Sequence, residues 1–174
     1  MDQRHDTHHG AIWRLLADDH AELDLLLASA GSCRSADELL AYDQFRRALL
    51  RHIAMEEKVL LPAAERTRGT PIPEARRLRL DHGALAALMI PTPQPPIVRA
   101  IRIVLERHNP LEESVGGVYD SCELLAGTDA CEVLAALKAM EPVPVKPHLD
   151  TPNVYDALRR ALARAGYDGQ LADT

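Results

Sequence analysis

Residues 51–65 read RHIAMEEKVLLPAAE and place His52 and Glu56 four positions apart in a helical pattern whose inner face is otherwise apolar. Residues four apart project from the same side of an α-helix, so both polar side chains are predicted to face the core. A buried carboxylate without a partner costs several kcal/mol or gives up its charge. The pair therefore needs a binding partner inside the protein.

Three other segments carry histidine in the same way, in the middle of an apolar seam with spacings of three and four residues. Residues 106–113 repeat the spacing of histidine and glutamate, whereas the other two segments have a single histidine. They are DDHAELDLLL (18–27, with His20), LDHGALAALM (80–89, with His82) and ERHNPLEE (106–113, with His108 and Glu112).

The wider sequence predicts an all-α fold. The chain has 174 residues, of which 47% are hydrophobic and only 3% aromatic, and it shows no alternating strand pattern. Four main helices are expected over residues 11–28, 35–66, 73–89 and from 96 past 108, with PTPQPP at 91–96 as a stiff turn. Their register favours an up-down-up-down four-helix bundle, which brings the polar positions of neighbouring helices to one height.

The remainder of the chain is expected to form an extension of the bundle. We expect a short helix over residues 129–139, an extended Pro-rich arm over 141–152 and a last amphipathic helix over 154–165. The predicted domain organisation is thus a metal-binding bundle at 10–125 and short helices with a Pro-rich arm at 126–174.

A shared metal site accounts for so many polar residues in one small core. Metal ions accept imidazole nitrogens and carboxylate oxygens, and their charge keeps the carboxylates ionised. A single histidine of this kind is more often an ordinary core residue, but the combination favours metal. The predicted metal ligands are His20, His52, Glu56, His82, His108 and Glu112. The other histidines are expected to bind no metal: His5, His8 and His9 in the polar tail, and His148 in the arm.

The four segments, in this order, resemble the histidine motifs of the hemerythrin-like, or HHE cation-binding, domain family over about residues 10 to 120. That resemblance implies a four-helix bundle with a non-haem di-iron centre, two iron ions bridged by oxide or hydroxide. It also implies that the six residues above are the ligands, with Glu56 and Glu112 bridging the irons.

The sequence departs from the family pattern at two points. Oxygen-carrying hemerythrins have a second histidine one turn after the first on the third helix, and here Ala86 takes that position. Pro110 lies between His108 and Glu112 and is expected to disturb the helix, which makes Glu113 the alternative ligand.

Other acidic residues flank the predicted ligands. Glu57 is expected to be solvated, because it is rotated by about 100° from Glu56 on an α-helix. Asp19, Asp24 and Asp81 are interpreted as surface residues or as residues that orient a ligand.

The favoured function is a metal-binding protein whose di-iron centre binds or senses dioxygen, nitric oxide, peroxide or iron itself. One alternative is a di-iron enzyme, such as a peroxidase, an oxidase or a factor that repairs iron centres. Ferritin-like oxidases use a carboxylate-rich Glu-x-x-His pattern, so this histidine-rich set argues more for a binding protein than for an enzyme. The second alternative is a mononuclear or zinc site, although zinc prefers four ligands and six are present.

Charge and cysteine content bear on partners and location. The net charge of −6 argues against nucleic acid and anionic membranes as partners, and a protein partner is left unspecified. The start, MDQRHDTHHG, lacks the apolar core of a secretory signal. Cys33, Cys122 and Cys131 form no paired motif and are expected to be reduced, which favours a cytoplasmic protein.

Overall fold

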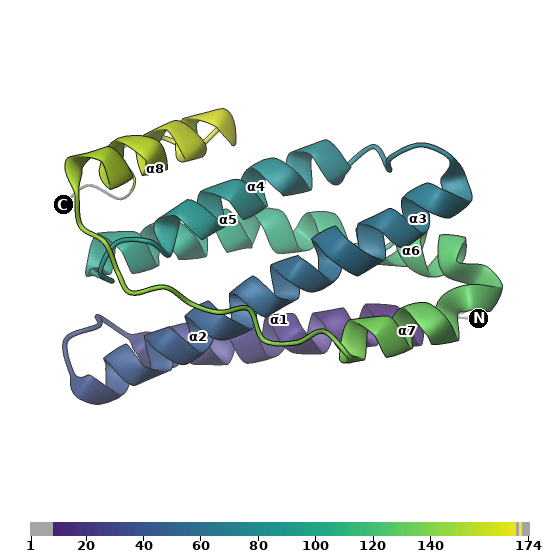
Figure 1. Ribbon diagram of the computed structural model, residues 1–174, viewed down its shortest axis with the longest axis horizontal. Helices are drawn as coiled ribbons and strands as arrows, with labels where there is room; N and C mark the ends of the chain where they lie inside the picture. Colours follow the sequence, from purple (N-terminus) through teal and green to yellow (C-terminus); the bar gives the residue numbers. More distant parts are fainter. Residues whose placement is uncertain (1–8, 170, 172–174) are drawn as a thin grey trace, which may run out of the picture.

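The computed structural model describes residues 9–169 and 171, and all regular structure in this part of the chain is helical. This confirms the predicted all-α class. The elements in chain order are α1 (Ala11–Ala30), α2 (Ala36–Met55), η1 (Glu56–Leu60), α3 (Leu61–Arg68), α4 (Ala75–Leu88), α5 (Pro95–Glu113), α6 (Val118–Ala126), η2 (Gly127–Asp129), α7 (Ala130–Lys138) and α8 (Pro152–Arg164). The long helices run alongside one another, with α1 packed along α2 and α4 between α5 and α8 (Figure 1).

The helix predicted at residues 35–66 is present, but a π-helical segment interrupts it. Its start is a capping box, in which the Ser35 hydroxyl accepts from the Glu38 amide and the Glu38 carboxylate accepts from the Ser35 amide. The π-helical segment η1 begins at Glu56. Such wide turns are frequently found at functional sites, and this one begins at a predicted ligand.

The sequence-based prediction missed helix α6. After α5, Gly116 adopts a φ of +75°, a left-handed conformation that suits glycine, and the chain reverses at this turn. Helix α6 then packs against α1, α3 and α5. It buries Val118, Tyr119 and Cys122, so the turn places a tyrosine inside the molecule.

The C-terminal part of the chain returns across the long helices as an extended strap (Figure 1). Its contacts include the Leu149 amide, which donates to the Ile90 carbonyl at 3.0 Å, and Asp150, which accepts from the Thr92 amide at 2.9 Å. Helix α8 follows, close to its predicted bounds, and buries Leu158 and Leu162 against the main core. The strap and α8 are therefore packed on the body of the protein.

The apolar core consists of two clusters with a polar layer between them. Along α1, for example, Leu16 belongs to one cluster and Leu23 to the other, and His20 lies between them. Along α4, His82 separates Leu78 from Leu85 in the same manner. The layer between the clusters is where the predicted ligands gather.

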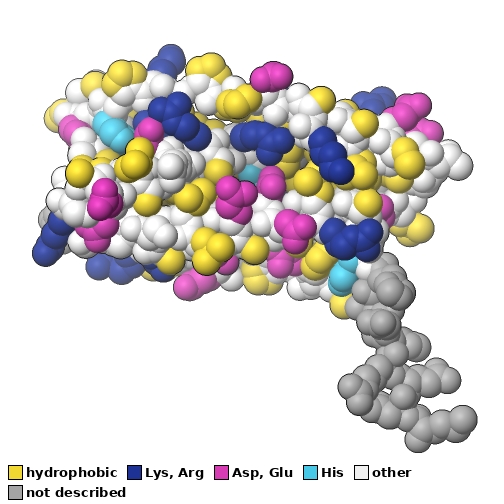
Figure 2. Space-filling view, turned by 90° about the horizontal axis from the view of Figure 1, so that it is seen from below, with side chains coloured by type: hydrophobic (Ala, Val, Ile, Leu, Met, Phe, Trp, Pro, Cys, Tyr) yellow, Lys and Arg dark blue, Asp and Glu magenta, His cyan; other side chains and the backbone are white. Residues whose placement is uncertain are grey.

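On the face shown in Figure 2, acidic and basic side chains are interspersed over the same helices. None of the helices in the described part of the chain has the length and apolar character to cross a membrane.

Candidate metal centre

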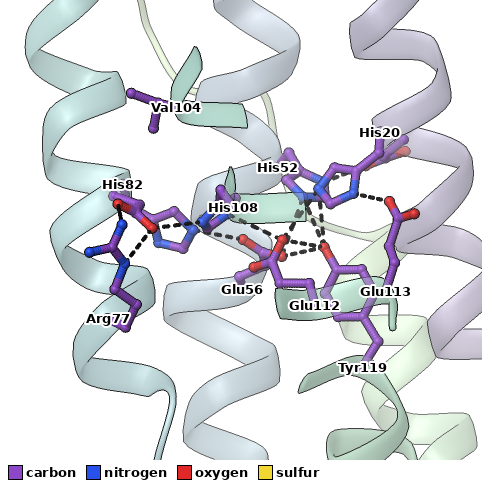
Figure 3. Close-up of polar contacts among 12 residues, drawn as sticks. His20, His52, Glu56, Arg77, His82, Val104, His108, Glu112, Glu113 and Tyr119 are labelled. Carbon is purple, nitrogen blue, oxygen red and sulfur yellow. Dashed lines mark hydrogen bonds and ion pairs between the residues drawn. The ribbon is translucent and has the colours of Figure 1, made fainter. Parts of the chain in front are cut away.

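All six predicted ligands lie together in the polar layer, and none exposes more than 4% of its surface. Figure 3 shows Glu56 and Glu112 between one histidine pair, His20 and His52, and the other pair, His82 and His108. Each pair and both glutamates form a group whose candidate ligand atoms lie within 4.8 Å of one another. The two groups share both carboxylates. We call them the α1/α2 half (His20 and His52) and the α4/α5 half (His82 and His108).

The distances show how the carboxylates lie between the halves. The two carboxylate oxygens of Glu56 face different halves. Oε1 lies 3.3 Å from Nε2 of His52, and Oε2 lies 3.1 Å from Nε2 of His82. Glu112 directs Oε2 to both sides, at 3.5 Å from Nε2 of His20 and 3.2 Å from Nε2 of His108. Each histidine therefore turns Nε2 inward, toward a carboxylate that also serves the opposite half.

The donor set fits metal ions because several inward atoms are buried without any hydrogen-bond partner. These atoms are Oε2 of Glu56, Nε2 of His82 and Oε1 of Glu112. Buried polar atoms of this kind are rare and costly in folded proteins. Metal coordination would satisfy all three, and imidazole with carboxylate is a donor set that iron and zinc accept.

The outer nitrogen of every histidine faces a carboxylate from a neighbouring helix. Nδ1 of His82 contacts Oε1 of Glu57 at 2.8 Å, and Nδ1 of His20 contacts Glu113. The other two pairs are looser: Nδ1 of His52 with Asp19 at 3.4 Å, and Nδ1 of His108 with Asp81 at 3.6 Å. A carboxylate at this position holds the imidazole in the orientation and tautomer that leave Nε2 free for metal.

Two sequence-based expectations need correction here. Glu57 is not simply solvated, because its carboxylate contacts Nδ1 of His82 on the neighbouring helix and its side chain is only 25% exposed. Pro110 does not divert Glu112, because α5 continues to Glu113 and Glu112 is fully buried. Glu113 therefore lies outside the ligand set and contacts the back of His20.

The outer carboxylates had a signal in the sequence that the prediction did not use. An Asp-His pair followed by His-x-x-x-Glu-Glu occurs twice along the chain. Within each copy, the aspartate faces the histidine of the following helix: Asp19 faces His52 and Asp81 faces His108. The last glutamate of each copy faces a histidine of the other copy.

Tyr119 is a residue of this candidate site that the prediction missed altogether. Its hydroxyl donates to Oε1 of Glu56 at 2.6 Å and lies 3.2 Å from Oε2 of Glu112. The same oxygen is 3.2 Å from Nε2 of His20 and 3.3 Å from Nε2 of His52, so it lies within the α1/α2 half. Burial and the two carboxylates raise its pKa well above the usual value, which keeps the phenol protonated in the absence of metal.

The charges of the site favour protonated histidines when no metal neutralises the carboxylates. Burial opposes a charge on His52, but Glu56 outweighs it and raises the pKa of His52 to about 10. Burial is likewise outweighed by Glu56 at His82, whose pKa rises to about 10, and by Asp81 at His108, whose pKa rises to about 9. Protons and metal ions would therefore compete for these imidazoles.

The remaining predicted positions lie away from the centre. His9 stacks on Trp13 with ring centroids 3.7 Å apart, and the ring of His148 lies 6.2 Å from that of Tyr42. His5 and His8 fall outside the described residues. Ala86 is partly buried and carries no atom that could bind a metal.

Comparisons of the chain with protein families, with curated proteins and with solved structures find no match.

Proposed function

We propose that this chain is a hemerythrin-like metal-binding protein, an up-down-up-down four-helix bundle that holds two iron ions. The observation that carries the proposal is the sharing of Glu56 and Glu112 by two buried groups, each completed by its own pair of histidines. One metal ion in each half would satisfy the unpartnered inward atoms of Glu56, Glu112 and His82. A single ion would leave one histidine pair facing the carboxylates alone.

The donor set supports iron over zinc. Structural zinc takes four ligands in a closed tetrahedron and does not call for two carboxylates shared between ions. Iron accepts imidazole and carboxylate ligands together. Two iron ions in this site would be able to bind dioxygen, nitric oxide or peroxide, or to exchange electrons with them. The protein would hold the ions, keep bulk water away through its apolar clusters and orient each imidazole through the outer carboxylate.

We further propose that the small ligand is sensed or bound rather than turned over. Four histidines against two carboxylates is a nitrogen-rich set, unlike the carboxylate-rich sites of ferritin-like oxidases. A signal to other molecules would have to pass through a protein partner, since the described chain is one packed helical body.

Metal analysis tests this proposal. Protein produced with iron available and purified without chelator should contain two iron ions per chain and should be coloured by ferric iron. Azide should change that absorption, because it is a small anion that binds exposed ferric ions. Colourless protein that carries zinc, or one metal ion per chain, would overturn the di-iron assignment.

A di-iron enzyme is the second candidate, and Tyr119 is the observation in its favour. Its hydroxyl holds a proton 2.6 Å from Glu56 and beside Nε2 of two histidines. A phenol in that position could donate its proton to an oxygen of a peroxide substrate. Steady-state consumption of hydrogen peroxide by the iron-loaded protein, lost in Tyr119→Phe, would favour the enzyme over the binding protein.

A further inference from the structure

Asp81, which faces His108, is held by Arg77 from the previous turn of α4. Arg77 Nε donates to Oδ2 of Asp81 at 3.0 Å, and Nη2 lies 2.9 Å from Oδ1. The Asp81 side chain is fully buried, and this hydrogen bond together with the second ion-pair contact holds its carboxylate beside Arg77. The position of Asp81 behind His108 thus depends on Arg77.

The same guanidinium is tied to the end of the C-terminal segment. Nη1 of Arg77 donates to the Ala165 carbonyl at 2.7 Å, and Nη2 donates to the Tyr167 hydroxyl at 3.2 Å. Tyr167 is itself buried, and α8 packs along α4. A continuous set of polar contacts therefore runs from the end of α8 to the back of the α4/α5 half.

A weaker contact of the same kind joins the start of that segment to the other half. Arg51 Nε donates to the Met140 carbonyl at 3.0 Å, and Nη1 lies 3.8 Å from the Asp19 carboxylate, which faces His52. The C-terminal segment, residues 140–167, therefore reaches the centre at both of its ends through an arginine, a carboxylate and a histidine.

We propose that the C-terminal segment positions the histidines of the metal centre and that Arg77 is the main positioning residue. This rests on the proposed di-iron function. Arg77 holds Asp81, Asp81 orients His108, and the metal ion in the α4/α5 half is retained as a result. Loss of an orienting carboxylate costs about 10–100-fold in metal affinity in other proteins.

The effect is confined mainly to the α4/α5 half. The contact through Arg77 combines a 3.0 Å hydrogen bond to Oδ2 of Asp81 with a 2.9 Å ion-pair contact to Oδ1, and it ends on a fully buried carboxylate. The contact through Arg51 to Asp19 is 3.8 Å long, and the Arg51 side chain is 31% exposed. Solvent weakens such an exposed pair, so the α1/α2 half depends less on the C-terminal segment.

Arg77→Lys provides the test, because lysine keeps the positive charge but lacks the planar fork. Arg47→Lys is the matched control: Arg47 also contacts an aspartate four residues away through Nε and Nη2, at 3.1 and 2.8 Å, but on the exposed surface. The readout is the release of iron from the full-length, iron-loaded protein to an excess of chelator, followed by absorbance. The unmodified protein and Arg47→Lys should release both irons slowly.

In Arg77→Lys, half of the iron should leave about 10-fold faster or more, while the other half keeps its original rate. Asp81→Asn should reproduce this pattern. Equal acceleration of both halves would show a general loosening of the fold and overturn the proposal, as would unchanged release of both. If the unmodified protein does not hold two irons, the proposed function itself has failed, and metal analysis before the release experiment reveals this.

Discussion

Oε2 of Glu56 lies 3.1 Å from Nε2 of His82, yet neither atom has a hydrogen-bond partner. The two atoms are therefore close without the geometry of a hydrogen bond. Two ligands of one metal ion would lie in this way. Because the other oxygen of Glu56 faces His52, the same side chain serves both halves of the centre.

The sharing of Glu56 predicts how many metal ions each substitution removes. Glu56→Gln replaces a charged ligand of both halves and should remove most of both irons. His82→Ala removes a ligand of the α4/α5 half alone, so about one iron per chain should remain. Elemental analysis of the purified variants measures these ratios. Retention of two irons by Glu56→Gln would show that this carboxylate does not join the two halves.

Raising the pH should destabilise the metal-free protein, whereas bound metal should stabilise the fold. Folding raises the pKa of His52, His82 and His108 from 6.5 to about 10, 10 and 9, so their charging stabilises the metal-free protein fully below about pH 6.5. That stabilisation is lost as the pH rises toward 9–10. Glu56 has its pKa lowered, and its contribution is lost only in acid, below its usual value of 4.5.

Melting of chelator-treated and iron-loaded protein at pH 6, 7.5 and 9 measures the effect. The melting temperature of the metal-free protein should fall by several degrees over this range, because each kcal/mol corresponds to roughly 2–4 °C for a chain of this size. The loaded protein should change less, since metal binds the neutral imidazoles and gains affinity as protons leave. If the difference in melting temperature between the iron-loaded and the metal-free protein became smaller toward pH 9, the prediction would be wrong.

The inward placement of the six candidate ligands could be predicted from the sequence because each position depends only on helical spacing. His52 and Glu56, or His108 and Glu112, share a face whenever the segment is helical, and an apolar seam shows which face is buried. The contacts of the outer nitrogen of each histidine, Nδ1, do not follow from helical spacing in the same way. Glu57 reaches His82 across a helix interface. Asp19 reaches His52 across a helix interface, and single-helix periodicity carries no information on either contact.

Tyr119 could not be predicted for a related reason. Its position depends on the chain reversal at Gly116 and Gly117, which returns α6 to the end of the long helices. Two adjacent glycines favour a helix end, but they do not show the direction in which the chain continues. Val118, Tyr119 and Cys122 do have the spacing of a buried helix face, which is the signal that was available.

Tyr119→Phe should destabilise the metal-free protein more than the iron-loaded protein. Without metal, the tyrosine hydroxyl donates to Oε1 of Glu56, and its loss leaves a buried carboxylate oxygen without this donor. Such a loss costs about 1–3 kcal/mol. Metal binding would satisfy the carboxylate by other means. Denaturant unfolding of both forms measures the difference, and a larger loss in the iron-loaded form would show instead that the phenol oxygen itself binds iron.

The last prediction concerns the route by which small ligands reach the centre. A cavity of about 490 Å³ between α1 and α5 is lined by His20, Glu113 and, on the α1 side, the small residues Ala17 and Ala21. We expect small molecules to approach the α1/α2 half from this side. Ala21→Phe should fill part of this cavity and slow azide binding to the iron-loaded protein about 10-fold, a barrier increase of about 1.4 kcal/mol.

Ala28→Phe is the control, because Ala28 is an exposed alanine on the same helix and does not line the cavity. Both variants should keep two irons and the original melting temperature, since neither alters a ligand or an apolar core position. Stopped-flow absorbance with azide then compares the association rates. If both variants bind azide at the rate of the unmodified protein, small ligands reach the centre by another route, and the cavity behind His20 serves no access role.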